Sequence, residues 1–310
     1  MRLASVRSGL AETFDDVVAV AVDTEGTIVA SSGDIAMPFY YRSAIKPIQA
    51  FAAISTGLDL PPEHLALASS SHGGYPVHIA IVRAMLADAG LDESALRTTP
   101  GRPRSRRADT ALIERGDHTR RPILHNCSGK HAGWLAACVT AGWDTDTYLD
   151  PDHPLQRAIV DAVTAYTGLD PRPVGVDGCG APTLRGDVCG LARAFAALDA
   201  AEELRSIRDA VAAYPALVAE NRDDDGRVGA VWGGPQKGGA AGSFAMARAG
   251  IGIASKSVSG DSTNAILGAL VLADRLGMIT EGMRSALDRQ FAPPVFGAGR
   301  VVGHVEVVAE

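Results

Sequence analysis

The apolar residues of the chain change their spacing twice along its length. Between residues 17 and 32, VVAVAVDTEGTIVASS has two apolar runs on either side of a polar turn, which predicts a pair of strands. From about residue 43 to 220, stretches such as HIAIVRAMLADAGL and KHAGWLAACVTAGW place Ala and Leu at helical spacing. After residue 240, GSFAMARAGIGIASKSV predicts two more strands, DSTNAILGALVLADRLGM a buried helix and RVVGHVEVVAE a closing strand.

This distribution predicts an α+β fold. If the strands of residues 1–40 and 240–310 share one antiparallel sheet, the helical lobe of about residues 43–230 must be inserted on one side of it. No internal repeat or linker interrupts the pattern. We therefore expect one catalytic domain over residues 1–310.

Composition and charge narrow the range of partners. Apolar residues make up 46% of the chain, charged residues make up 21% and the formal net charge is -7, which gives no overall attraction to nucleic acid or to anionic membranes. No stretch approaches the roughly eighteen apolar residues of a membrane span, and the N-terminus has no apolar leader segment. We expect a cytoplasmic protein. The basic stretch PGRPRSRRAD, residues 100–109, is interpreted as a solvated loop.

The first candidate for chemistry is RSAIKPIQA, residues 42–50. Pro47 lacks an N–H and is tolerated only in the first turn of a helix, so a helix should begin at or just before Ala44. Ser43 would then lie beside the helix start, with Lys46 one turn away, in the S-x-x-K spacing by which some hydrolases activate a serine. On its own, such a motif is more often an N-cap serine followed by a surface lysine.

Two further segments supply possible partners. Ser71 ends the serine cluster of ALASSSHGG, and Lys237 opens KGG before a predicted strand, a loose match to the K-T-G of S-x-x-K hydrolases. Lys256, on the next predicted strand, is an alternative second lysine. Neither segment is specific by itself, since ALASSSHGG also reads as an ordinary turn.

Two of the four cysteines lie among glycines and polar residues. Cys127 is part of HNCSGKHAGW and Cys179 of VDGCGAPTL. Two cysteines and a third donor can hold zinc in a tetrahedral site, but on spacing alone two free thiols near a cleft are the more common arrangement. The chain is large enough to fold without disulfides, so bridges are not expected.

In this order, these motifs resemble the asparaginase II family of rhizobial-type, thermolabile L-asparaginases. The resemblance covers nearly the whole chain, and the two cysteine motifs are its most specific part. It implies a fold similar to β-lactamases and serine-dependent glutaminases, a homodimer, and hydrolysis of the asparagine side-chain amide to aspartate and ammonia.

The resemblance also implies the site residues. The paired serines and lysines of the family fall on Ser43 with Lys46 and on Ser71 with Lys237. Its zinc ligands fall on three residues of the cysteine motifs: Cys127, Lys130 and Cys179. We expect Ser43 to be the nucleophile and Lys46 its base, although the two serines could exchange roles. By charge complementarity, Arg42 and Asp177 are candidates for binding the α-carboxylate and α-amino group of the substrate.

Two positions depart from the family pattern. Tyr75 and Ala241 stand where the family usually carries glutamates. If those carboxylates bind an amino group or tune the second lysine, the protein could be a weak asparaginase, act on glutamine or another small amide, or bind an amino acid or zinc without catalysis. Loss of both acidic groups suggests a changed pocket.

Overall fold

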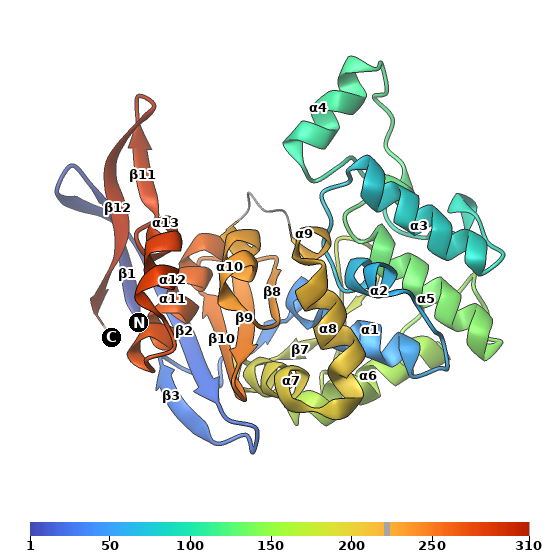
Figure 1. The fold of residues 1–310 in the computed structure, drawn as a ribbon, viewed down its shortest axis with the longest axis horizontal. Helices are drawn as coiled ribbons and strands as arrows, with labels where there is room; N and C mark the ends of the chain where they lie inside the picture. The colour runs from blue at the N-terminus through green and yellow to red at the C-terminus, as the bar shows by residue number, and fades with distance from the viewer. Residues whose placement is uncertain (220–223, 310) are drawn as a thin grey trace. The chain divides into compact units, whose positions relative to one another are not determined.

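The computed structural model describes residues 1–219 and 224–309 and divides the chain into two compact units. The first unit comprises Met1–Ala44, Gly186–Glu202 and Asn221–Glu310. The second comprises Ile45–Arg185 and Glu203–Glu220. Figure 1 labels most helices and strands of both units.

The first unit is built on one 8-stranded sheet, in which every recorded strand pair is antiparallel. The strand order is β11-β12-β1-β2-β10-β9-β8, and β3 also pairs with β2. N- and C-terminal strands therefore share one sheet, which confirms the predicted α+β class. The strands are β1 (Arg2–Arg7), β2 (Leu10–Val22), β3 (Ile28–Ser32), β8 (Gln236–Gly239), β9 (Ser243–Arg248), β10 (Ile251–Ser257), β11 (Pro294–Gly297) and β12 (Arg300–Ala309).

Two helices cover the centre of this sheet on opposite faces. α7 (Val188–Ala200) packs directly on the sheet face toward which a side chain at Gly252 of β10 would point. An added Cβ on Gly252 would lie 2.1 Å from the carbonyl oxygen of Ala192 in this helix. α11 (Ser262–Arg275) packs on the other face, whose buried residues include Ala19, Ala21, Phe244, Met246 and Ile253. Because both faces are covered, residues 17–22 are buried consecutively, which explains the uninterrupted apolar run VVAVAV.

Short elements complete the first unit. They are β4 (Phe39–Tyr40), α10 (Asp224–Trp232), α12 (Glu281–Ala286) and α13 (Asp288–Phe291), with β7 (Arg185–Gly186) at its boundary. Both α7 and α10 fall within the range expected for the helical lobe, yet they belong to the unit that contains the sheet. For α7 the physical reason is its close packing on β10.

The second unit is helical and is centred on α5 (Ser128–Ala141). This helix is buried from Ser128 to Cys138 and contacts α1, α2, α3 and α6, so it has no solvent face over most of its length. The other elements are α1 (Lys46–Ile54), α2 (Pro62–Ala68), α3 (Pro76–Asp88), α4 (Arg106–Glu114), α6 (Pro154–Thr167), α8 (Arg205–Ala213), α9 (Pro215–Val218), β5 (Gly175–Val176) and β6 (Pro182–Thr183). Across the described residues, none of the helices has the length and apolar character needed to cross a membrane.

The packing of α7 on β10 leads to the first prediction. Gly252→Ala should lower the free energy of unfolding by about 3 kcal/mol, because the new Cβ would also lie 2.6 Å from the backbone nitrogen of Ala196 and neither backbone can yield cheaply. Urea unfolding followed by circular dichroism measures the change.

Gly282→Ala is the matched control in the same unit. Gly282 lies exposed in α12, where the nearest atom to an added Cβ is 3.9 Å away, so alanine should be neutral or stabilise by up to about 1 kcal/mol. Equal stability of the two variants would contradict the described packing.

Candidate active site

The S-x-x-K segment begins a helix, as predicted, but through a tighter turn. Arg42–Ile45 form a 3-10 helix, and α1 follows from Lys46 with Ile45 at its N-cap position. Pro47 lies in the first turn of α1, where its missing N–H costs no helical hydrogen bond. Arg42 has a φ of 52°, in the left-handed region that costs a non-glycine residue roughly 1–3 kcal/mol. The backbone next to Ser43 is therefore strained.

The side chain of Lys46 ends among groups from two other segments. Residue Lys46 is only 1% exposed. Its Nζ donates to the carbonyl oxygen of Ser70 at 2.5 Å, to Ser71 Oγ at 3.0 Å and to Cys127 Sγ at 3.3 Å. Burial lowers the pKa of Lys46 from its usual value, because a buried ammonium loses its hydration. The arrangement places a lysine base beside a serine hydroxyl.

A close approach of α5 to α2 brings these segments together. An added Cβ on Gly129 would lie 2.7 Å from the carbonyl oxygen of Leu67, so only glycine permits this spacing. The backbone N–H of His72 donates to the carbonyl oxygen of Asn126 at 3.0 Å. The serine cluster after α2 is thereby fixed against the start of α5, where Cys127 lies.

Cys127 and Cys179 are buried free thiols that lie side by side. A hydrogen bond from Cys179 holds the pKa of Cys127 well below its usual value, and the charges of Lys46 and Lys130 add to this effect. Cys138, further along α5, is in an apolar setting, and burial raises its pKa to about 12. Cys127 is therefore prepared for ionic chemistry, whereas Cys138 is not.

Lys130 adds a nitrogen to this pair of sulfurs. Its Nζ donates to Cys179 Sγ at 3.6 Å and lies 4.2 Å from the ring centre of Trp134. Within residues 1–219 and 224–309, no group of three or more His, Cys, Asp or Glu side chains is arranged to hold a metal ion. Two converging sulfurs and an amine nevertheless fit a tetrahedral zinc ion with an open fourth position.

His72 is held as a neutral imidazole by a chain of hydrogen bonds. Its Nδ1 accepts from the backbone N–H of Gly74 at 3.2 Å, so the ring proton is on Nε2, which donates to Ser128 Oγ at 2.9 Å. Ser128 in turn donates to the carbonyl oxygen of Ile123 at 2.8 Å. Burial, with the nearby charge of His78 next in importance, lowers the pKa of His72 well below its usual value. The Ser-His-Gly motif thus positions Ser71 through His72.

In the first unit, Ser43 and Lys237 lie on segments that pack together. Lys237 is a buried residue of β8. An added Cβ on Gly239 of the same strand would lie 2.8 Å from the carbonyl oxygen of Tyr41 and 2.9 Å from the backbone nitrogen of Ala44. β8 therefore lies directly against the backbone on both sides of Ser43. Lys256, the alternative second lysine, donates instead to the carbonyl oxygen of Ala241 at 2.7 Å, in an exposed setting.

The two positions at which the family resemblance leads us to expect glutamates differ in environment. Ala241 lies exposed between β8 and β9 with a φ of 58°. Tyr75 precedes α3 as its N-cap residue, and its hydroxyl oxygen accepts a hydrogen bond from Ser105 Oγ at 2.8 Å. Position 75 is thus part of the second unit's packing, whereas position 241 is a surface turn.

Within the second unit, the structure brings Lys46 to Ser71 and Cys127, and Lys130 to Cys179. Asp177 lies two residues before Cys179, in a turn closed by its own N–H bond to the carbonyl oxygen of Ala181 at 2.8 Å. Arg42, Ser43 and Lys237 belong to the first unit. Sequence reasoning missed the contact of Lys46 with Cys127 and the roles of His72 and Ser128, because both depend on how α2 and α5 pack.

The chain matches one protein family over nearly its whole length. The model of the family described as L-asparaginase II matches residues 3–307. Curated protein sequences gave no match.

Solved structures provide weaker likenesses. Mglu in its native form is 16% identical, with 90% of this chain and 69% of that chain covered and a TM-score of 0.47. A β-lactamase from Mycobacterium bovis is 17% identical, with 84% and 93% covered and a TM-score of 0.40. Mglu in an L-glutamate binding form is 16% identical, with 86% and 62% covered and a TM-score of 0.39. None of these likenesses bears on activity.

The buried, neutral His72 predicts a pH dependence of stability. Above the unfolded-state pKa of about 6.5, His72 is neutral in both states and contributes nothing. Below it, only the unfolded state takes up the proton, so His72 should lower the free energy of unfolding by about 1.4 kcal/mol per pH unit until its lowered folded pKa is reached. Urea unfolding between pH 7 and pH 5 measures this slope.

The variant His72→Gln removes that proton and should have a shallower slope by about the same amount. His118→Gln, at an exposed histidine, is the matched control. Its free energy of unfolding should change with pH by nearly the same amount as that of the wild type. Identical slopes for His72→Gln and the wild type would show that His72 is not buried as a neutral group.

Proposed function

Because the chain belongs to the L-asparaginase II family, we propose that this amidohydrolase hydrolyses the side-chain amide of L-asparagine to L-aspartate and ammonia through a serine nucleophile. The observation that supports the mechanism most directly is the 3.0 Å hydrogen bond between Lys46 Nζ and Ser71 Oγ inside a buried site. A serine hydroxyl needs an adjacent base to become nucleophilic, and an amine within hydrogen-bond reach can provide it.

In the proposed reaction Ser43 Oγ attacks the amide carbon while Lys46 takes the hydroxyl proton. The proton then passes through Ser71, which already shares a hydrogen bond with Lys46, to the departing nitrogen, and ammonia leaves. Water then attacks the resulting ester while Lys46 takes a proton from it and passes that proton to Ser43 Oγ, so that aspartate is released and both the Ser43 hydroxyl and the neutral Lys46 amine are restored. The opposite assignment, with Ser71 as nucleophile, uses the same base.

The proposal gives Lys237 the role of second lysine. Its support is the K-x-G motif and the packing of β8 against the backbone around Ser43, with Lys237 two residues from Gly239 on the same strand face. Arg42 and Asp177 are proposed to bind the α-carboxylate and the α-amino group of the substrate, because their charges are complementary to these groups.

We also propose that Cys127, Lys130 and Cys179 hold a zinc ion. When bound, zinc would act as a Lewis acid and a fixed positive charge. The two sulfurs would fix the start of α5 against the turn at residues 177–181. Lys46 would keep its hydrogen bonds to Ser70 and Ser71.

A second candidate function is hydrolysis of glutamine or another small amide. Tyr75 and Ala241, in place of the family glutamates, favour this alternative because the loss of two carboxylates changes what can be bound. An amino-acid-binding or zinc-binding protein without activity is the third outcome. Ammonia release with asparagine, glutamine and a panel of small amides distinguishes them.

Substitution of the serines and of the lysine tests the mechanism. Ser43→Ala, Ser71→Ala and Lys46→Met should each lower kcat for asparagine at least about 100-fold, because each removes a nucleophile or a proton carrier. The losses should not add in double variants, since the groups act as one unit. Ammonia release measured by a coupled assay gives the rates, and trapping of the acyl-enzyme by mass spectrometry shows which serine is modified.

Ser55→Ala is the matched control. Ser55 is exposed at the end of α1, and its hydroxyl donates only to the carbonyl oxygen of Phe51 at 2.8 Å, so activity should be unchanged. Full activity of both serine variants would exclude the serine mechanism. A folded wild type that releases no ammonia from any amide would exclude the proposed function.

Metal content tests the zinc site separately. The wild type purified without chelator should carry about one zinc per chain, and Cys127→Ser and Cys179→Ser should carry at most about a tenth of that, because a hydroxyl is a poor substitute for a thiolate ligand. Mass spectrometry of the eluted metal measures the zinc content.

Cys138→Ser is the control. It places a hydroxyl in the apolar core and should lower the free energy of unfolding by about 1 kcal/mol, while its zinc content stays that of the wild type. Equal zinc in all four proteins would refute the site.

A further inference from the structure

A cavity of about 270 Å³ lies between α3 and α4 in the second unit, outside the candidate active site. Its apolar wall comes from both helices and from the 3-10 turn at Pro122–Leu124: Ile79, Ala108, Ala111, Leu112 and Leu124. An engineered cavity of about 150 Å³ accommodates a benzene molecule, so this one has room for a ring with a short chain.

α4 contributes one face of this cavity. Ala108, Ala111, Leu112 and Arg115 follow one another at helical spacing, and all four line the cavity. Of the residues of α4, only Ala108 is fully buried, so this face has not been covered by other parts of the described chain. The two alanines are too small to fill the space that they border. A helix face that is apolar and unfilled is suited to contact a ligand.

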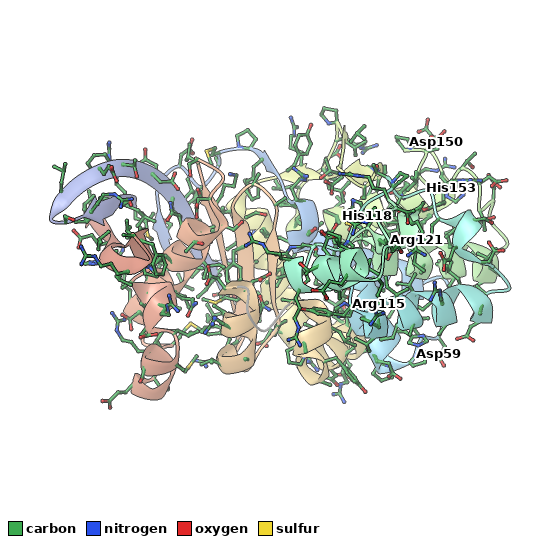
Figure 2. All side chains as sticks on the ribbon, turned by 90° about the horizontal axis from the view of Figure 1, so that it is seen from above. Asp59, Arg115, His118, Arg121, Asp150 and His153 are labelled. Atoms are coloured by element: carbon green, nitrogen blue, oxygen red, sulfur yellow. The ribbon has the colours of Figure 1, made fainter. Side chains whose placement is uncertain are left out.

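The cavity carries strong positive charge. Among the described residues, its lining includes no acidic side chain and four arginines: Arg83, Arg107, Arg115 and Arg121. Residues 100–121 contain seven arginines against three acidic residues, a net charge of +4 in a chain whose formal net charge is -7. Figure 2 labels two of the lining arginines, Arg115 at the end of α4 and Arg121 in the segment that follows it.

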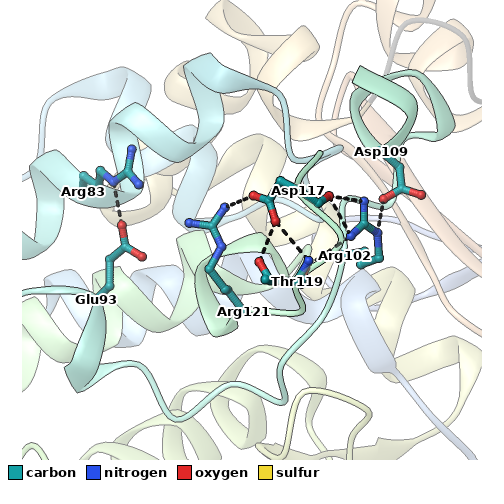
Figure 3. Close-up of polar contacts among 7 residues, drawn as sticks. All are labelled: Arg83, Glu93, Arg102, Asp109, Asp117, Thr119 and Arg121. Atoms are coloured by element: carbon teal, nitrogen blue, oxygen red, sulfur yellow. Dashed lines mark hydrogen bonds and ion pairs between the residues drawn. The ribbon is translucent and has the colours of Figure 1, made fainter. Parts of the chain in front are cut away.

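Two of the four lining arginines have no counter-ion in the described part of the chain. Arg83 pairs with Glu93 at 2.7 Å and Arg121 with Asp117 at 2.9 Å, as Figure 3 shows. The side chains of Arg107 and Arg115 make no ion pair or hydrogen bond with any described residue. In addition, Nε of Arg121 is buried without an acceptor. An unsatisfied buried donor costs roughly 1–3 kcal/mol, and a bound anion would satisfy it.

We infer that this cavity is a binding site for a small carboxylate with an aromatic or aliphatic body. The apolar wall takes the body of the ligand, and Arg107 and Arg115 take the carboxylate, which matches the planar guanidinium in a bidentate contact. The chemistry differs from that of the amide site around Lys46, and the inference is independent of the proposed function.

The cavity also adjoins the segment that carries Ser71. Gly74 and Tyr75 line it, and Ser105, the residue before α4, donates its N–H to the carbonyl oxygen of Gly73 at 2.9 Å. Arg104 donates to the carbonyl oxygen of Ser71 at 3.2 Å. A ligand in the cavity would therefore contact the same loop whose first residue bonds to Lys46.

Calorimetric titration of the intact protein tests the inference. The probes are 4-phenylbutyrate, its neutral isostere 4-phenylbutanamide, acetate, and inorganic phosphate. 4-Phenylbutyrate should bind with a Kd of about 1 mM or lower, and the other three at least about tenfold more weakly, because each lacks either the charge or the apolar body. Amide hydrogen exchange of residues 71–75 should slow when the carboxylate binds.

Three variants locate the site. Arg107→Gln combined with Arg115→Gln should weaken 4-phenylbutyrate at least about tenfold. Ala111→Phe should abolish binding by filling the cavity, and thermal unfolding checks that it folds. Arg106→Gln is the matched control, since Arg106 is exposed on the same helix and does not line the cavity, and it should bind as the wild type does.

Other results would overturn the inference. Equal affinity for the neutral amide would mean that the arginines do not select a carboxylate, and equal affinity for phosphate or acetate would mean that the apolar wall takes no part. Binding that survives in Ala111→Phe and in the double arginine variant would place the ligand elsewhere. Absence of binding by every probe would show that the cavity is not a site for such ligands.

Discussion

The hydrogen bonding of one buried amine determines how the second unit is built around Lys46. An ammonium group has three N–H donors, and a buried charge without partners costs several kcal/mol. Three acceptors surround Lys46 Nζ: a carbonyl oxygen at Ser70, a hydroxyl at Ser71 and a sulfur at Cys127. Because these acceptors come from two segments about 24 and 81 residues further along the chain, α1, α2 and α5 must meet at one point for the lysine to be buried at all.

Glycine makes this meeting possible. At Gly129, one residue before Lys130, a side chain would collide with the carbonyl oxygen of Leu67. The glycine at position 129 is therefore explained by the packing of α5 on α2. The same packing buries Lys130 against Trp134 and directs its amine toward Cys179. One small residue thus connects the serine and lysine groups with the two thiols.

The sequence was a good guide to elements and a poor guide to contacts. The strand pairs at residues 17–32 and 243–257, the buried helix near residue 262 and the helix at Lys46 are all present, because hydrophobic spacing and Pro47 are local signals. The partners of Lys46 were not predictable, since S-x-x-K spacing pairs it with Ser43 while the hydrogen bond observed is to Ser71. The basic stretch at residues 100–109 was interpreted as a solvated loop, whereas Pro103 and Ser105 are buried and Arg102 bonds to Asp109. Long-range packing decides such contacts, and no window of sequence contains it.

Tyr75, where the family resemblance leads us to expect a glutamate, belongs to the lining of the charged cavity. Tyr75 lines the cavity, and its hydroxyl bonds to Ser105 at the start of α4. A glutamate at this position would place a carboxylate at a wall that already contains four arginines, and would neutralise part of their charge from within the chain. With tyrosine, position 75 carries no charge, so no carboxylate of the cavity lining opposes an anion that approaches Arg107 and Arg115 from solution. A tyrosine at position 75 therefore places no acidic group next to the Ser71 loop and leaves the cavity open to an external carboxylate.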